Sequence, residues 1–312
     1  MQVDVYSIDE AEIENIEAGL VTWWTLKGAT CLQSLGSDWE AAGLDPAFKP
    51  KPNGLGTALW KAMSSGIFSK YKDDGLLVRK LPGERSAWAV IRERIKGRRE
   101  EANLDYEPLM SVWLEAGEPA PTYWKCPSIQ LDLGMFKDEK EFDTWFEEAV
   151  FEVNREFRIN QTILDAREMS NWLINVLQNY IHGIGLRKRG GIYYVPPKAR
   201  ALWEEIVNLV SNVHSDCQHT IYTMPVVKGE QMTRAVLDAL ALEVNNCVSK
   251  IESDLTAGIQ NRAIQNRKST AISLDQKLAA YKGLLGDGIS LLETKVEDLR
   301  ASITELELAN DF

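Results

Sequence analysis

Apolar residues recur with two different periods along this chain, and these periods predict where helices and strands lie. A spacing of three and four positions predicts helices over residues 29–42, 55–71, 138–158, 165–183 and 198–213. The stretches 76–95 and 109–136 are each predicted to form two strands around a proline-containing turn. "TIYTMPVV" predicts an edge strand, because Pro225 cannot donate a ladder hydrogen bond. "GLVTWWTL" fits either a strand or the buried start of a helix.

A helix, a linker, a second helix and a hairpin follow one another twice, at 29–95 and at 138–196. Both hairpins begin with leucine and a basic pair, in "LLVRKLPG" and "IGLRKRGG". Two helices followed by a two-stranded ribbon are the element order of winged-helix folds. The sequence therefore predicts two winged-helix-like units.

The pattern changes after residue 229, where apolar residues recur every three or four positions almost to the end of the chain. This spacing is typical of a coiled coil, whose apolar stripe needs a partner helix. Two arrangements fit: a helical hairpin that turns near "NRKST" at 266–270, or a longer helix that turns at "GDG", 286–288. The stripe then folds back on the chain or meets another copy. The residues expected to mediate oligomerisation are Leu274, Leu278, Tyr281, Leu285, Leu292, Val296, Leu299, Ile303 and Leu306.

Together these patterns predict an α+β fold with two helix-turn-helix plus β-hairpin units and a long C-terminal coiled-coil arm. The expected domains are 1–135, a winged-helix-like unit with extra strands, 136–228, the second such unit, and 229–312, the helical arm.

The charge balance limits the partners. The chain has 46 acidic and 35 basic residues, for a formal net charge of −11. Proteins that hold nucleic acid non-specifically carry a basic face, so bulk electrostatic binding to nucleic acid is disfavoured. An acidic protein favours basic partners, and its overall charge is still compatible with one basic hairpin that contacts nucleic acid. Neither a membrane-spanning apolar run nor a secretory leader is visible, so we expect a cytoplasmic protein without a membrane role.

No catalytic motif stands out. Phosphate-loop, dinucleotide-binding and nucleophile-elbow patterns are absent, and only three histidines are present to act as bases. "HSDCQH" gathers three zinc-ligand types, His214, Cys217 and His219, at a spacing that matches no known zinc motif. A polar helix end beside a buried thiol explains this stretch better. We therefore expect neither enzyme activity nor a cofactor.

The stretch "GLRKRGGIYYVPP" at 185–197 predicts a β-hairpin with a cluster of basic residues. With Gly190 and Gly191 as a two-residue turn, alternation places Tyr193 on the core face with Ile184, Leu186 and Val195. The other face then carries Arg187, Arg189, Ile192 and Tyr194, and guanidinium and phenol groups together can hold a phosphate or stack on a base. The alternative is an exposed hairpin whose charges prevent edge pairing. The candidate nucleic-acid contacts are Arg187, Lys188, Arg189 and Tyr194, with Arg79 and Lys80 in the counterpart hairpin.

The same stretch, with the preceding helix "MSNWLINVLQNYI", resembles a group of uncharacterised bacteriophage and bacterial proteins. The shared plan is Leu-Arg, two residues, Gly-Gly, then an aromatic strand that ends in Val-Pro. The resemblance implies a cytosolic, phage-encoded protein and supplies no catalytic residues.

These observations favour a non-enzymatic interaction protein that self-assembles through the C-terminal arm and binds a macromolecule, with a protein partner preferred over nucleic acid. If the chain is phage-encoded, a host protein is the natural target. Two alternatives remain open: a nucleic-acid-binding protein that uses the basic hairpins, and an acidic mimic of DNA that occupies a basic partner.

Overall fold

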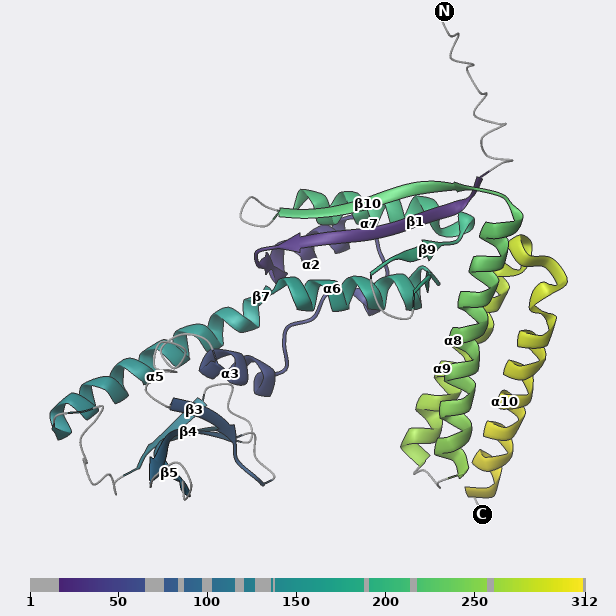
Figure 1. Cartoon of the computed structure of the whole chain (residues 1–312). Coiled ribbons are helices and arrows are strands. Elements are labelled where there is room, and N and C mark those ends of the chain that lie inside the picture. The colour runs from purple at the N-terminus through teal and green to yellow at the C-terminus, as the bar shows by residue number, and fades with distance from the viewer. Residues whose placement is uncertain are drawn as a thin grey trace, which may run out of the picture. The chain divides into compact units, whose positions relative to one another are not determined.

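The computed structural model describes residues 17–64, 76–83, 87–96, 103–115, 121–126, 136, 138–187, 191–213, 218–256 and 261–310. Helices and antiparallel sheets confirm the α+β class (Figure 1). Contacts divide the chain into two compact units. The first comprises Met1–Thr30, Ser34–Lys49 and Ala166–Phe312, and the second comprises Cys31–Gln33 and Pro50–Asp165. This division differs from the predicted boundaries at 135/136 and 228/229, because the second unit is inserted into the first.

The second unit is built on an antiparallel meander, in which each strand pairs with the next one along the chain. Its strands are β3 (Leu76–Lys80), β4 (Ala87–Lys96), β5 (Asn103–Leu114) and β6 (Pro121–Lys125). Both strand pairs predicted from alternation are therefore confirmed, and Val90 lies opposite both Val78 and Met110. The helices α3 (Leu55–Ser64) and α5 (Glu139–Thr162) share one apolar core with this sheet.

Helix α5 shows how the sequence builds this core. Asp138 accepts a hydrogen bond of 2.8 Å from the Glu141 backbone N–H and so caps the first turn. One face then carries apolar residues at three- and four-residue spacing, as predicted. The members of this stripe that are buried are Phe142, Trp145, Ala149, Val153 and Phe157.

The first unit centres on strand β1 (Glu17–Lys27), so "GLVTWWTL" belongs to a strand. The strand order of its sheet is β10-β1-β9-β8, formed with β8 (Ile184–Gly185), β9 (Tyr193–Val195) and β10 (Gln218–Val227). β10 lies at the edge, which confirms the prediction from Pro225.

Aromatic residues pack on one face of this sheet. Trp24 stacks on Tyr193 with ring centroids 5.0 Å apart, and its indole N–H donates to Ser170 at 3.0 Å. The Trp203 indole N–H donates to the Thr22 hydroxyl at 3.2 Å. Ser170 lies on α6 (Ala166–Asn175) and Trp203 on α7 (Arg200–Asn212). The structure confirms these two predicted helices, together with α2 (Leu32–Ala41), and α6 continues into a π-helix at Val176–Tyr180.

The predicted register of the basic hairpin is wrong by three residues. Ile184 pairs with Tyr194, and the Leu186 backbone N–H donates to the Ile192 carbonyl, so the connection is residues 187–191 and not a two-residue turn. An odd shift inverts which side chains share a face. The physical reason is tertiary: β9 also pairs with β1, and Tyr194 joins Ile184 in the core under the C-terminal helices.

The C-terminal segment folds into three helices that lie side by side, α8 (Glu230–Thr256), α9 (Asn261–Leu285) and α10 (Ser290–Asn310) (Figure 1). The chain reverses at Gly286–Ile289, where Gly286 has φ +55°, a left-handed value that suits glycine. The predicted turn at 286–288 is thus confirmed, but the single longer helix before it is not, because α8 ends at Thr256 and α9 begins at Asn261. A turn at 266–270 is wrong, because those residues lie within α9.

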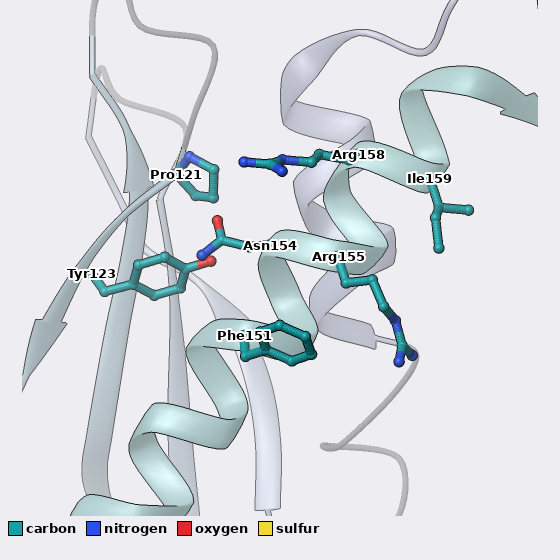
Figure 2. A pocket seen from close by; sticks show the side chains of 7 residues that line it. All are labelled: Pro121, Tyr123, Phe151, Asn154, Arg155, Arg158 and Ile159. Atoms are coloured by element: carbon teal, nitrogen blue, oxygen red, sulfur yellow. The ribbon is translucent and has the colours of Figure 1, made fainter.

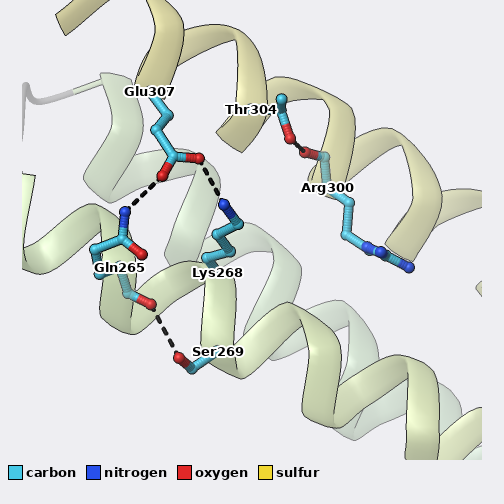
Figure 3. Close-up of polar contacts among 6 residues, drawn as sticks. All are labelled: Gln265, Lys268, Ser269, Arg300, Thr304 and Glu307. Carbon is cyan, nitrogen blue, oxygen red and sulfur yellow. Dashed lines mark hydrogen bonds and ion pairs between the residues drawn. The ribbon is translucent and has the colours of Figure 1, made fainter. Parts of the chain in front are cut away.

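Polar contacts fix the register of these helices. Glu307 on α10 accepts hydrogen bonds from Gln265 at 2.5 Å and from Lys268 at 2.8 Å on α9 (Figure 3). The Lys268 hydrogen bond is the main reason that the pKa of Glu307 is lowered. Lys282 pairs with Glu293 at 2.9 Å near the reversal, so the two helices are antiparallel.

The winged-helix-like units are not seen in the structure. The first hairpin, β3 and β4, is part of a four-stranded meander, and the second hairpin shares its sheet with β1 and β10. Further strands thus extend each hairpin into a larger sheet, and in the first unit these strands, β1 and β10, are not the hairpin's neighbours in a local helix-hairpin repeat. Across the described residues, we find no helix whose length and hydropathy would let it span a membrane.

Candidate functional site

The structure places the predicted nucleic-acid contacts in different environments. Arg187 is exposed at the end of the hairpin, whereas Lys188 and Arg189 lie outside the described residues. Arg79 and Lys80 are exposed at the end of β3, an edge strand of the second unit. Arg187, Arg79 and Lys80 are therefore accessible to solvent, each within its own unit.

Tyr194 does not lie on an exposed face beside Arg187, so that part of the prediction is wrong. Its side chain is fully buried, its hydroxyl donates to the Ala18 carbonyl, and its ring lies 5.9 Å from that of Tyr281. Burial raises the pKa of Tyr194. In this position the residue supports the fold and cannot stack on a base.

The residues expected to mediate oligomerisation instead form the core of the C-terminal helices. Leu274, Leu278 and Tyr281 pack in one cluster with α8 residues such as Val244. Lys277 on α9 donates a hydrogen bond of 3.2 Å to the backbone carbonyl of Gly183, next to strand β8. The remaining members, Leu285, Leu292, Val296, Leu299, Ile303 and Leu306, belong to the same cluster. The stripe therefore finds its partner within the chain, which is the fold-back arrangement.

Of the zinc-ligand candidates, only His219 is described, and His214 and Cys217 lie outside the described residues. His219 Nε2 and Thr30 Oγ1 share a hydrogen bond of 2.6 Å, and Nδ1 is buried without a partner. Burial lowers the pKa of this imidazole. Within the described part of the chain, no group of three His, Cys, Asp or Glu side chains could hold a metal ion.

Strand β10 presents an exposed, uncharged surface in the first unit. Tyr222 is 43% exposed and Met224 51%, and the Tyr222 ring stacks on Trp23 of β1 with centroids 5.3 Å apart. All four residues at 222–225 are exposed, so neither face of the strand is covered there. We call Trp23, Tyr222, Thr223 and Met224 the β10 edge surface.

Two features make this edge suited to strand pairing. Among the described strands, only β1 pairs with β10, so the backbone groups on its outer side have no strand partner. The ten residues of β10 include no charged side chain. Natural edge strands are commonly protected by charges that discourage pairing, whereas β10 has Pro225 and a register irregularity beside it but no charge. Sequence reasoning identified the edge from Pro225 but missed its exposed aromatic face, because exposure depends on the whole sheet.

A pocket of about 780 Å³ lies in the second unit, between β6 and the outer face of α5. Its lining residues are Pro121, Tyr123, Phe151, Asn154, Arg155, Arg158 and Ile159 (Figure 2). Sequence analysis described only the buried face of α5. The signal for this site was Phe151, an aromatic residue that stands outside the apolar stripe.

The two arginines of the pocket differ in electrostatics. Arg155 pairs with Glu152 at 2.7 Å and with Glu156 at 3.0 Å, and the hydrogen bond that Arg155 donates to Glu156 is the main cause of its raised pKa. Arg158 has no acidic partner among the described residues and is exposed. The positive charge of Arg158 is therefore available to a ligand.

Comparison with protein-family models finds a match that covers residues 19–311 and carries the description "Family of unknown function (DUF6744)". The chain belongs to this family. The matched residues include parts of both units and the three C-terminal helices. Neither the curated proteins nor the solved structures include a significant match. The family assigns no activity to any residue, and function must be argued from the surfaces above.

Proposed function

We propose that the protein is a non-enzymatic interaction protein that binds another protein through the β10 edge surface. The observation that supports this most strongly is an uncharged edge strand with its Tyr222 and Met224 side chains exposed. Aromatic residues and Met are enriched in the cores of protein interfaces. An extended segment of a partner adds to such an edge by main-chain hydrogen bonds, with side-chain contacts that provide specificity.

Charge favours a different protein over a second copy of this chain. Each copy carries a formal net charge of −11, so two copies repel, whereas a basic protein is attracted. The partner that fits is a basic protein that presents an extended, uncharged segment to β10. Self-association through Leu274 and the rest of the apolar stripe is not part of the proposal, because that stripe is buried within the chain.

The test is affinity capture from an extract of the source organism, with the full chain and two variants. In the first variant, Tyr222→Lys and Met224→Lys together place charge on the edge. The control variant, Leu291→Lys, adds charge at a residue of α10 that is 77% exposed. We expect a captured protein that the double variant loses and the control retains, because cations on an edge oppose pairing.

Parallel captures with nuclease and with added DNA decide between the alternatives. A partner that resists nuclease and is not displaced by DNA supports the proposal. Nuclease-sensitive capture that depends on Arg187 would instead assign a nucleic-acid role to the basic hairpin. Displacement by DNA would indicate an acidic DNA mimic, and equal capture by both variants would exclude the β10 edge.

A further inference from the structure

The pocket between β6 and α5 lies in the second unit and has no role in the proposed function. Its volume of about 780 Å³ falls within the range of roughly 300–1,000 Å³ that is usual for small-molecule sites. Phe151 on the rim of the pocket is 67% exposed, and Ile159 is 38% exposed. The other exposed side chains of α5 are polar, so these two residues account for a large apolar area in contact with water. These two residues provide an apolar contact for a ligand.

Polar groups converge on the other side of the pocket. Figure 2 shows the side chains of Tyr123, Asn154 and Arg158 directed into the same space, while Arg155 points away from Tyr123. Because Arg158 has no acidic partner among the described residues, its guanidinium can pair with an anion in a bidentate manner.

The Tyr123 hydroxyl gives an independent indication of a ligand. Its oxygen is buried and has no hydrogen-bond partner in the described structure, a state that costs free energy in a folded protein. Burial raises the pKa of Tyr123, so the hydroxyl stays protonated and can donate. Tyr123 and Arg158 line the same pocket, so a ligand bound there can offer an acceptor to the hydroxyl and an anion to the guanidinium.

We propose that this pocket binds an organic carboxylate that carries an aromatic or branched apolar group. The carboxylate pairs with Arg158 and accepts from Tyr123 and the Asn154 amide, and the apolar group packs on Phe151 and Ile159. Such a ligand is either a free acid or the C-terminal residue of a polypeptide, since both present the same carboxylate and apolar body.

The experiment is an NMR titration of the ¹⁵N-labelled full chain with 3-phenylpropionate, and with an N-acetylated hexapeptide of uncharged side chains that ends in phenylalanine with a free carboxylate. We expect saturable shifts with at least one of them, which identifies the source. The matched neutral probes are 3-phenylpropionamide and the amidated hexapeptide. Loss of the charged hydrogen bond should weaken their binding about tenfold or more.

Three variants test the residues. Arg158→Gln should weaken binding of the acid about tenfold, whereas Arg234→Gln on α8, whose side chain is 82% exposed, removes the same charge and should leave binding unchanged. Tyr123→Phe should weaken binding several-fold without loss of thermal stability, because it removes only a buried, unpaired hydroxyl.

Three results from the probes and the arginine variants would overturn the proposal. They are no binding of either acid, equal binding of acid and amide, and equal effects of Arg158→Gln and Arg234→Gln. A Tyr123→Phe variant that folds normally and binds like the wild type would remove the hydroxyl from the site and leave only a surface cation, which also contradicts the proposal.

Discussion

His219 and Tyr194, two side chains that the sequence singled out for chemistry, are held inside the first unit. His219 is 9% exposed and shares a hydrogen bond with Thr30, while Tyr194 is fully buried and donates to the Ala18 carbonyl. Both residues use a polar group to make a hydrogen bond inside the protein. A pattern of residue types in the sequence cannot distinguish this structural role from a role in a binding site.

The lowered pKa of His219 predicts how stability depends on pH. The unfolded chain binds a proton at this imidazole near the ordinary pKa of about 6.5, and the folded chain binds it only at lower pH. Stability contributed by neutral His219 is thus present above about pH 6.5 and is lost as pH falls toward the folded pKa. His219→Gln should lose less stability than the wild type between about pH 7 and pH 5.

Urea unfolding at a series of pH values measures this difference. The pKa of His182 is lowered as well, first by burial and then by Lys277, so the variant should keep part of the dependence. Wild-type and variant curves that run parallel over the whole range would show that His219 is not held neutral by the fold.

At the scale of elements, local periodicity predicted most helices and strands, because each buries one face and its apolar residues repeat with the geometry of that element. Helix α5 and the pair β3 and β4 follow their patterns closely. The predicted register of β8 and β9 was wrong for a physical reason. Gly190 and Gly191 favour a tight turn, but pairing with β1 and burial of Tyr194 outweigh that local preference.

The reversal between α9 and α10 gives a prediction at this scale. Gly286 has φ +55°, whereas Gly283 lies inside α9, and a Cβ added at either one meets no atom within 4 Å. Gly286→Ala should destabilise the fold by about 1 kcal/mol, because an L-residue is strained in the left-handed region. Gly283→Ala should stabilise it by roughly 0.5–1 kcal/mol through helix propensity. Chemical denaturation measures the free energy of unfolding of both variants. If both substitutions changed it in the same direction, the reversal at Gly286 would be contradicted.

For the whole molecule, the insertion of the second unit into the first explains what the sequence could not show. The predicted repeat of helices and hairpin assumed that neighbours in sequence form one unit, whereas β1 pairs with β10 about 200 residues later. The same long-range pairing leaves β10 at an edge and exposes Tyr222 and Met224. The candidate partner surface is therefore a product of topology, while the apolar C-terminal stripe, the strongest sequence signal, is satisfied within the chain.

The most direct test of the account is site-specific photo-crosslinking in the source organism. A photoreactive phenylalanine analogue replaces Tyr222 in the full chain, and in the control it replaces Leu291 on α10. The account predicts a protein adduct from position 222 that resists nuclease, contains a partner of net positive charge and is absent from position 291. An adduct with nucleic acid, an adduct between two copies of this chain, or equal labelling from both positions would contradict it.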